Sequence, residues 1–305
     1  MRAHTLQRSG ALAIISKDRH VYGIVEGDLP DNNGNPRYKL IGINQASTFT
    51  GFCARHDAEL FKELETKPFI ASKAQLFLLA YRSMAKEIYA KRSAMRLIPL
   101  LRKGDVGKDA VEQVRLQSEL FIHAQLQQQG LDDLESSWAD YQAAFLAGDY
   151  DRFSAYLIFA SSTPDFAVSG GFYPEFDFQS RALQSLASLE PLDFLSFSVI
   201  PFQSGGVIAL VWDSESARAC QQFAASLDRL NNNEIPDALV RLTFEHFENT
   251  YANPRWWENL SDEQRQQLLG RLGKSASNQV NRLADCLSDD GLRTATWKVI
   301  SKEWR

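Results

Sequence analysis

The segment at residues 194–212, FLSFSVIPFQSGGVIALVW, indicates the fold of this chain most directly. Two runs rich in β-branched and aromatic residues, 194–202 and 205–212, are joined by a short link that contains Gly205 and Gly206. Such runs favour strands, and a short glycine-containing link favours a hairpin. The segment therefore predicts two neighbouring antiparallel strands.

The residues around this hairpin extend the prediction to a larger sheet. Residues 156–160 and 166–169 have the same strand-forming composition. After residue 214 the pattern becomes helical, which predicts helices over 215–230, 235–248 and 276–287, and a helix that begins at a capping box of Ser261 and Gln264. We expect an antiparallel sheet with helices on one face.

The region before residue 150 is mainly helical. No proline occurs between Pro99 and Pro164. Ser72 and Gln75 fit a capping box for a helix to about residue 101, and the pattern predicts further helices over 109–129, ended by Gly130, and over 131–147. The first segment predicts a short helix over 8–16, strands over 20–25 and 37–43, and a helix over 55–65.

Together these patterns predict an α+β protein with three parts. A small, basic, mixed module occupies residues 1–70, a long helical section residues 71–150, and an antiparallel sheet with C-terminal helices residues 151–305. No repeat of fixed period is visible, so a solenoid is not expected.

Composition excludes several classes of protein. The chain has 305 residues, of which 44% are hydrophobic and 23% charged, enough for real cores and unlike a disordered tail or a disulfide-rich mini-protein. No apolar run approaches the roughly 18 residues of a membrane span, and the first 20 residues lack the apolar region of a secretory signal. The three cysteines are far apart, as free thiols are in a reducing compartment. We expect a cytoplasmic protein without a membrane partner.

Charge is distributed unevenly along the chain. Residues 1–108 hold 18 lysines and arginines against 10 acidic residues, whereas residues 109–305 hold 15 against 28. A basic first third suits a phosphate-bearing partner, and it equally suits an acidic surface of the same chain or of another subunit.

Two short motifs in the first segment contain residues with catalytic potential. AHTLQ at residues 3–7 contains His4, and GFCARHD at residues 51–57 contains Cys53, His56 and Asp57 at a predicted helix start. A histidine base and a hard divalent ion are the groups that phosphodiester hydrolysis needs.

This arrangement resembles the His-Me finger, or HNH, nucleases over about the first 65 residues. The resemblance implies that His4 is the general base, that His56 with Asp57 and Cys53 binds a divalent Mg, Mn or Zn ion, and that Asn44 is the middle asparagine. The sequence departs from the family because the cysteine pair that many members carry before the first histidine is absent. The alternative interpretation is structural: His4 in a terminal segment, Cys53 as a small buried residue, and His56 with Asp57 as a polar helix start.

A second candidate site is a basic stripe on the predicted helix from residue 72. Its members fall near one helical face and include an aromatic residue, as in grooves that follow a nucleic-acid backbone. The predicted nucleic-acid contacts are Arg82, Lys86, Tyr89, Arg92 and Arg96. A solvated helix face, neutralised by acidic parts of the chain, is the alternative.

A third candidate lies at residues 244–258. Glu245 and Glu248 are three residues apart on a predicted helix, with His246 between them, and carboxylates so placed can bind a metal or share a proton. Trp256 and Trp257 are predicted to cover the core or to form an interface with a protein partner or a second copy.

Two functional hypotheses follow from these candidates. In the first, the protein contacts nucleic acid through a diverged HNH-like module and, if it is an enzyme, is a metal-dependent nuclease; a role in bacterial antiviral defence or as a toxin would suit it by analogy. In the second, it is a non-enzymatic interaction or assembly factor with structural histidines. Phosphate-binding loops and the serine-hydrolase elbow are absent from the sequence.

Overall fold

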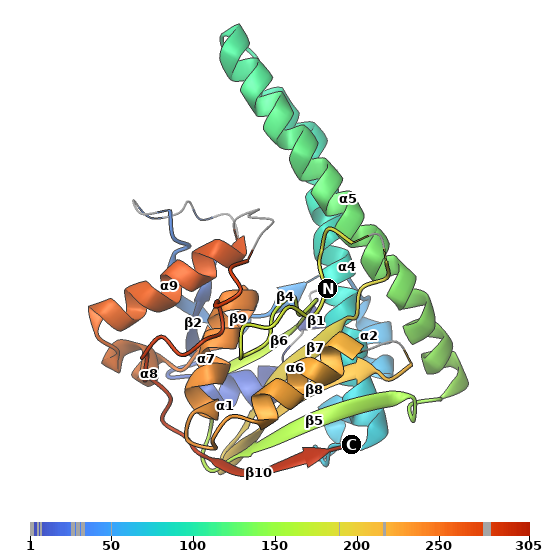
Figure 1. Cartoon of the computed structure of the whole chain (residues 1–305), viewed down its shortest axis with the longest axis vertical. Helices are drawn as coiled ribbons and strands as arrows, with labels where there is room; N and C mark the ends of the chain where they lie inside the picture. Colours follow the sequence, from blue (N-terminus) through green and yellow to red (C-terminus); the bar gives the residue numbers. More distant parts are fainter. Residues whose placement is uncertain are drawn as a thin grey trace.

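The computed structural model describes residues 3–4, 6, 8–25, 28, 31, 34–49, 51–188, 190–215, 218–276 and 282–305. It shows an α+β fold around an eight-stranded antiparallel sheet with the strand order β10-β5-β8-β7-β6-β9-β2-β3 (Figure 1). The strands of this sheet are β2 (His20–Ile24), β3 (Tyr38–Gly42), β5 (Phe153–Ala160), β6 (Phe166–Phe172), β7 (Leu195–Phe202), β8 (Gly205–Asp213), β9 (Thr250–Ala252) and β10 (Val299–Trp304).

The β7–β8 hairpin lies in the middle of the sheet. Its ladder runs from Ser196 opposite Val211 to Phe202 opposite Gly205, which confirms the predicted hairpin. The strands predicted over 156–160 and 166–169 are also present, and they flank the hairpin because β5 pairs with β8 and β6 pairs with β7.

Helices cover both faces of the sheet, so the prediction of helices on one face is wrong. Ala209 and Val211 of β8 pack with α4 (Lys73–Leu101) and α5 (Ala110–Ala147), whereas Ile208 and Leu210 pack with α6 (Arg218–Asp228) and α7 (Ile235–His246). Neighbouring side chains of a strand point to opposite faces, and both sets are buried here. The physical reason is visible in β8, whose apolar run does not alternate with polar residues.

The N-terminal residues contribute strands to the same sheet. β2 pairs with β3 along its whole length and with β9 at Tyr22 opposite Ala252, so that these two N-terminal strands extend the sheet formed by strands from residues 151–305. A second, two-stranded sheet pairs β1 (Ala3–His4) with β4 (Thr48–Phe49). The predicted short helix is present as a π-helical turn at Arg8–Leu12 followed by α1 (Ala13–Ile15). Beyond β4 lie α2 (Ala54–Leu60) and α3 (Lys62–Thr66).

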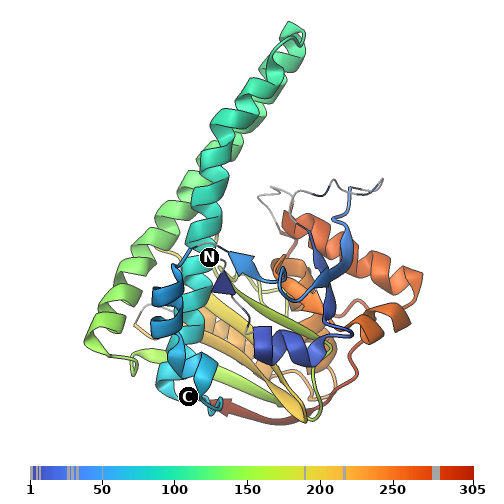
Figure 2. The same cartoon turned by 180° about the vertical axis from the view of Figure 1, so that it is seen from behind.

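The long helices α4 and α5 form an antiparallel hairpin that projects from the sheet (Figures 1 and 2). The predicted capping box of Ser72 and Gln75 begins α4, and the Asp109 side chain accepts hydrogen bonds at the start of α5. The prediction that Gly130 ends a helix is wrong, because α5 continues through it. At this position a Cβ would lie 3.0 Å from the Lys91 Nζ, so the glycine gives room to a side chain of α4.

The C-terminal part follows the prediction only in places. The Ser261–Gln264 capping box is confirmed at the start of α9 (Asp262–Ala276), after the short α8 (Pro254–Asn259). The helix predicted over 276–287 is wrong where it can be compared: residues 284–287 form turns, while 277–281 lie outside the described residues. Among the residues that the structure describes, no helix has both the length and the apolar character needed to cross a bilayer.

Candidate functional site

The outer part of the α4–α5 hairpin, residues 91–130, is called the arm below. Ile98 of α4 and Leu120 of α5 are buried along it. At its end, the Gln117 side chain donates to the Arg102 carbonyl oxygen (2.9 Å) and to the Asp105 carboxylate (2.8 Å). These contacts hold the short link between the two helices in place.

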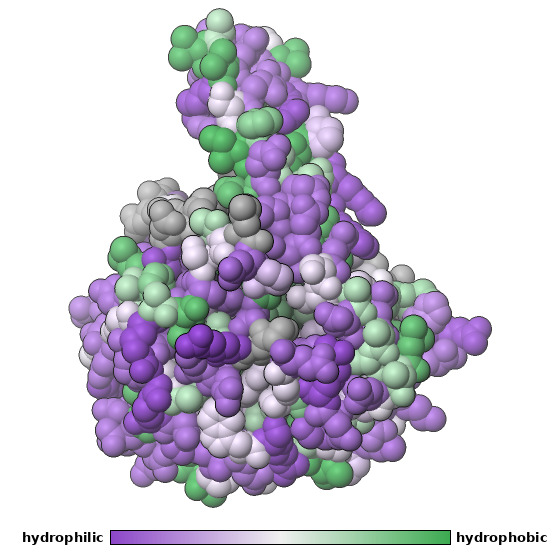
Figure 3. Space-filling view, turned by 45° about the vertical axis from the view of Figure 1, so that its right-hand side comes forward, coloured by the Kyte–Doolittle hydropathy of each residue, from purple (hydrophilic) through white to green (hydrophobic). Residues whose placement is uncertain are grey.

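The arm exposes an unusual number of large apolar side chains. Eight of the fourteen such residues that are exposed in the described part of the chain lie within residues 97–122, and Figure 3 shows apolar surface toward the outer end of the molecule. These eight are Leu97, Leu100, Leu101, Val106, Val111, Val114, Phe121 and Ile122. Because contiguous exposed apolar surface marks contact sites and scattered single residues do not, the arm is a candidate contact surface.

The predicted basic stripe is not one exposed surface. Arg82 is buried, with its Nη1 2.8 Å from the Glu65 carboxylate and its guanidinium 4.0 Å from the centre of the Phe61 ring. This placement corrects the expectation that Arg82 contacts nucleic acid, because a guanidinium held in this way is closed to a phosphate backbone. Lys86 forms an ion pair with Glu87 at 3.1 Å and has about one fifth of its side chain exposed.

The outer members of the stripe lie on or near the arm. Tyr89 is half-buried, and the Arg92 guanidinium is 2.6 Å from the Glu135 carboxylate of α5. Arg96 is exposed, and so is Lys103, which lies beyond the predicted stripe in the link after α4. Neither has an ion pair within the described residues. The positive charge that remains available is therefore at the arm rather than along the whole stripe.

The N-terminal candidates lie at the start of α2. Cys53 precedes the helix and is exposed, His56 is exposed, and Asp57 is half-buried. The backbone of His4 pairs with Thr48 in β4, but the His4 side chain lies outside the described residues. In the described part of the chain, no three or more histidine, cysteine and acidic side chains converge as a metal site requires. The metal centre stays a prediction.

Trp256 and Trp257 belong to the core, which is one of the two predicted alternatives, and the alternative of an interface is wrong. Only 5% of Trp256 and 4% of Trp257 is exposed. Trp257 packs against the rings of Tyr38 (centroids 4.6 Å apart) and Phe244 (6.1 Å). The Trp256 indole donates to the Thr294 carbonyl oxygen at 2.7 Å. The two residues join α8 to α7 and β3.

The predicted pairing of Glu245 with Glu248 is wrong, because α7 ends at His246 and Glu248 is exposed beyond it. Glu245 is buried and lies 3.0 Å from the Arg271 guanidinium. Burial raises the pKa of Glu245 although Arg271 opposes this, and burial together with Arg282 and Arg271 lowers the pKa of His246 well below its usual range. Such a paired, desolvated cluster is typical of structural charge networks in cores.

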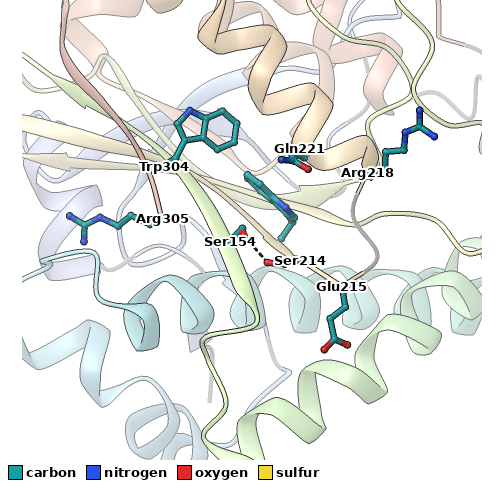
Figure 4. A pocket seen from close by; sticks show the side chains of 8 residues that line it. Ser154, Ser214, Glu215, Arg218, Gln221, Trp304 and Arg305 are labelled. Atoms are coloured by element: carbon teal, nitrogen blue, oxygen red, sulfur yellow. Dashed lines mark hydrogen bonds between the residues drawn. The ribbon is translucent and has the colours of Figure 1, made fainter.

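An open pocket of about 750 Å³ lies where β5, β8 and β10 meet the start of α6 (Figure 4). The hydroxyls of Ser154 and Ser214 are hydrogen-bonded to each other at 2.6 Å, and Trp304 forms one wall. The remaining lining residues are Trp212, Glu215, Arg218, Gln221 and Arg305. This lining contains neither histidine nor cysteine. None of the sequence-predicted site residues lines it.

Comparison of the chain with protein-family models, with curated protein sequences and with solved structures finds no match.

Proposed function

We propose that this protein is a non-enzymatic interaction or assembly factor and that the arm is its contact element. The observation that carries the proposal is the gathering of eight exposed large apolar side chains within residues 97–122. Exposing such side chains to water is unfavourable, and burying each against a partner recovers about 1.5–3 kcal/mol. The exposed Arg96 and Lys103 add polar specificity at the same place.

Site-specific photo-crosslinking in producing cells tests this proposal. A photoreactive residue replaces Val111 on the arm, which is 79% exposed, or Leu146, which is 84% exposed near the other end of the same helix. We expect discrete adducts from position 111 and none from position 146. Equal adducts from the two positions, or none from position 111, would refute a contact role of the arm.

A metal-dependent nuclease is a second candidate, and one observation favours it. β1, which contains His4, pairs with β4, and β4 precedes the helix that contains His56. The backbones of the two predicted nuclease residues thus belong to one local unit of strands and helix, as the resemblance to HNH nucleases requires.

Cleavage assays with single- and double-stranded DNA and RNA in Mg²⁺ or Mn²⁺ test the nuclease candidate. His4→Ala and His56→Ala are compared with His20→Ala, a control at an exposed histidine of β2. Cleavage that is lost in the first two variants and retained in the control supports it. An inactive wild-type protein, or equal activity in all variants, counts against it.

A further inference from the structure

The geometry points to a second copy of this chain as the partner of the arm: two arms pack side by side and antiparallel through α5. This inference rests on the proposed function of the arm as a contact element. It is carried by three features of residues 109–130: the spacing of exposed residues, the length of the arm, and the order of its charges.

The first feature is a line of exposed residues on α5, called the seam below. Its members recur at alternating intervals of three and four residues, which is the spacing that keeps one side of a helix against another helix. They are Val111, Val114, Ser118, Phe121 and Gln125, and all five are exposed. Because Leu120 and Leu131 of the same helix are buried toward α4 and the sheet, the seam is a second packing line without a partner in the described chain.

The second feature is the length of the arm. Two antiparallel copies of the seam are related by a twofold axis. This axis passes beside Ser118, the midpoint of the seam. Val111 then faces Gln125 of the second copy, and Val114 faces Ile122. The link between the helices ends before Asp109 and lies level with residue 128 of the second copy. Shortly after that residue, at Leu131, α5 becomes buried against the rest of the chain. The free length of the arm therefore matches the overlap that the seam requires.

The third feature is charge. Residues 109–119 of the arm include Asp109, Glu112, Arg115 and Glu119, whereas residues 120–128, LFIHAQLQQ, contain no lysine, arginine or acidic residue. Antiparallel packing places each charged stretch beside an uncharged one. Parallel packing would place the two net-negative stretches, residues 109–119, beside each other, which is unfavourable.

The basic residues of α4 add to this complementarity. Lys91 lies against Gly130, so Arg96, five residues farther out, is level with Gln125 of α5. In the antiparallel register Gln125 faces Val111 of the second copy, which lies between Asp109 and Glu112. The exposed guanidinium of Arg96 is thus at the level of two carboxylates of the other arm.

Disulfide trapping and mass measurement in solution test the arrangement. In a Cys53→Ser background, which removes the exposed native thiol, Ser118→Cys is compared with Gln128→Cys. The two residues at position 118 meet at the proposed axis, whereas those at position 128 are about 30 Å apart along the helices. We expect oxidation to link two chains through position 118 but not through position 128.

The same protein is measured by light scattering with and without Val114→Glu and Phe121→Glu. We expect a dimer for the wild-type chain and a folded monomer for the double variant, because both side chains are exposed in the single chain and do not hold its core together. Linkage at both cysteine positions would overturn the antiparallel register. A wild-type monomer without linkage at position 118 would overturn the second copy as partner.

Photo-crosslinking at Val111 separates this inference from the proposed function. A second copy gives an adduct with twice the mass of the chain. Adducts with another protein, a nucleic acid or a lipid, together with a monomeric chain, would overturn the inference and leave the arm as a contact element. The absence of any adduct would refute both the second copy as partner and the arm as a contact element.

Discussion

Two apolar segments of the same helix have opposite environments. FLLAY at residues 77–81 of α4 is buried between the sheet and α5, whereas LIPLL at residues 97–101 is exposed except for Ile98. Both segments are apolar and both are helical. The difference lies in what surrounds them: the first has β5–β8 on one side and α5 on the other, and the second has α5 alone.

The comparison separates two uses of apolar residues. In the inner segment they hold the fold together, because their removal from water accompanies folding. In the outer segment most of them stay exposed, so we expect them to contribute little to folding. The predictions below test this separation, beginning with the largest expected effect.

Truncation of one residue from each segment gives the largest contrast. Phe77 is completely buried and contacts the rings of Tyr150 (4.6 Å between centroids) and Phe153 (4.9 Å), so we expect Phe77→Ala to lower the free energy of unfolding by about 3–5 kcal/mol. Leu100 is 63% exposed, and Leu100→Ala should change the free energy of unfolding by less than about 0.5 kcal/mol. Urea unfolding measures both. Equal losses would mean that the arm is part of the core.

Two arginines of α4 give a smaller contrast. Arg82→Ala removes the ion pair with Glu65 and the guanidinium that covers Phe61, and we expect the free energy of unfolding to fall by about 2–4 kcal/mol. Arg96 is exposed, so the free energy of unfolding of Arg96→Ala should stay within about 0.5 kcal/mol of the wild-type value. The same unfolding experiment compares them. A near-zero effect of Arg82→Ala would show that its ion pair contributes nothing net to stability.

The sequence predicts those elements of the fold that depend on local signals. The Ser72 and Ser261 capping boxes and the β7–β8 hairpin are each specified by a few neighbouring residues, and all are present. β10 escapes prediction because VISKEW at residues 299–304 mixes charged and apolar residues and forms a strand only through its pairing with β5. Gly130 gives a wrong prediction of a helix end, because the glycine there accommodates the side chain of Lys91, and this tertiary contact is not visible in the sequence.

The candidate site is less predictable than the fold. The spacing of Val114 and Phe121 is visible in the sequence, but a helix that packs in a core has the same spacing. Likewise, Arg82 and Arg96 lie on similar stretches of α4, and only the neighbouring Glu65 and Phe61 distinguish a buried cation from an exposed one. Exposure is a property of the assembled body, so sequence periodicity alone does not reveal it.

The stability of the folded chain should also depend on the protonation of Asp165, which lies in the sheet region and not on the arm. Burial raises the pKa of Asp165 to about 6, although the Thr296 amide and hydroxyl donate hydrogen bonds to its carboxylate. The folded state therefore holds this proton more tightly than the unfolded chain. The resulting stabilisation is complete below about pH 4 and is lost as the pH rises through 6, a change of roughly 1–3 kcal/mol.

Unfolding measured between pH 4 and pH 7 checks this dependence. Asp165→Asn should remove this part of the pH profile, and Leu100→Ala should keep the wild-type profile because it alters only the exposed segment. An unchanged profile in Asp165→Asn would assign the pH dependence to other groups.

The smallest effect is expected at Gly130, where the buried and exposed parts of the hairpin meet. Glycine inside a helix is unfavourable relative to alanine, so Gly130→Ala should stabilise the protein by about 0.5–1 kcal/mol if the added methyl group is accommodated. The atoms closest to a Cβ there are Nζ and Cε of Lys91, at 3.0 and 3.1 Å, and they form the end of a flexible side chain that can move aside. Thermal unfolding of Gly130→Ala, alone and with Lys91→Ala, measures the change. A loss of stability in the single variant that Lys91→Ala reverses would mean that the lysine is fixed across the helix at this boundary, and that it needs the space that Gly130 leaves.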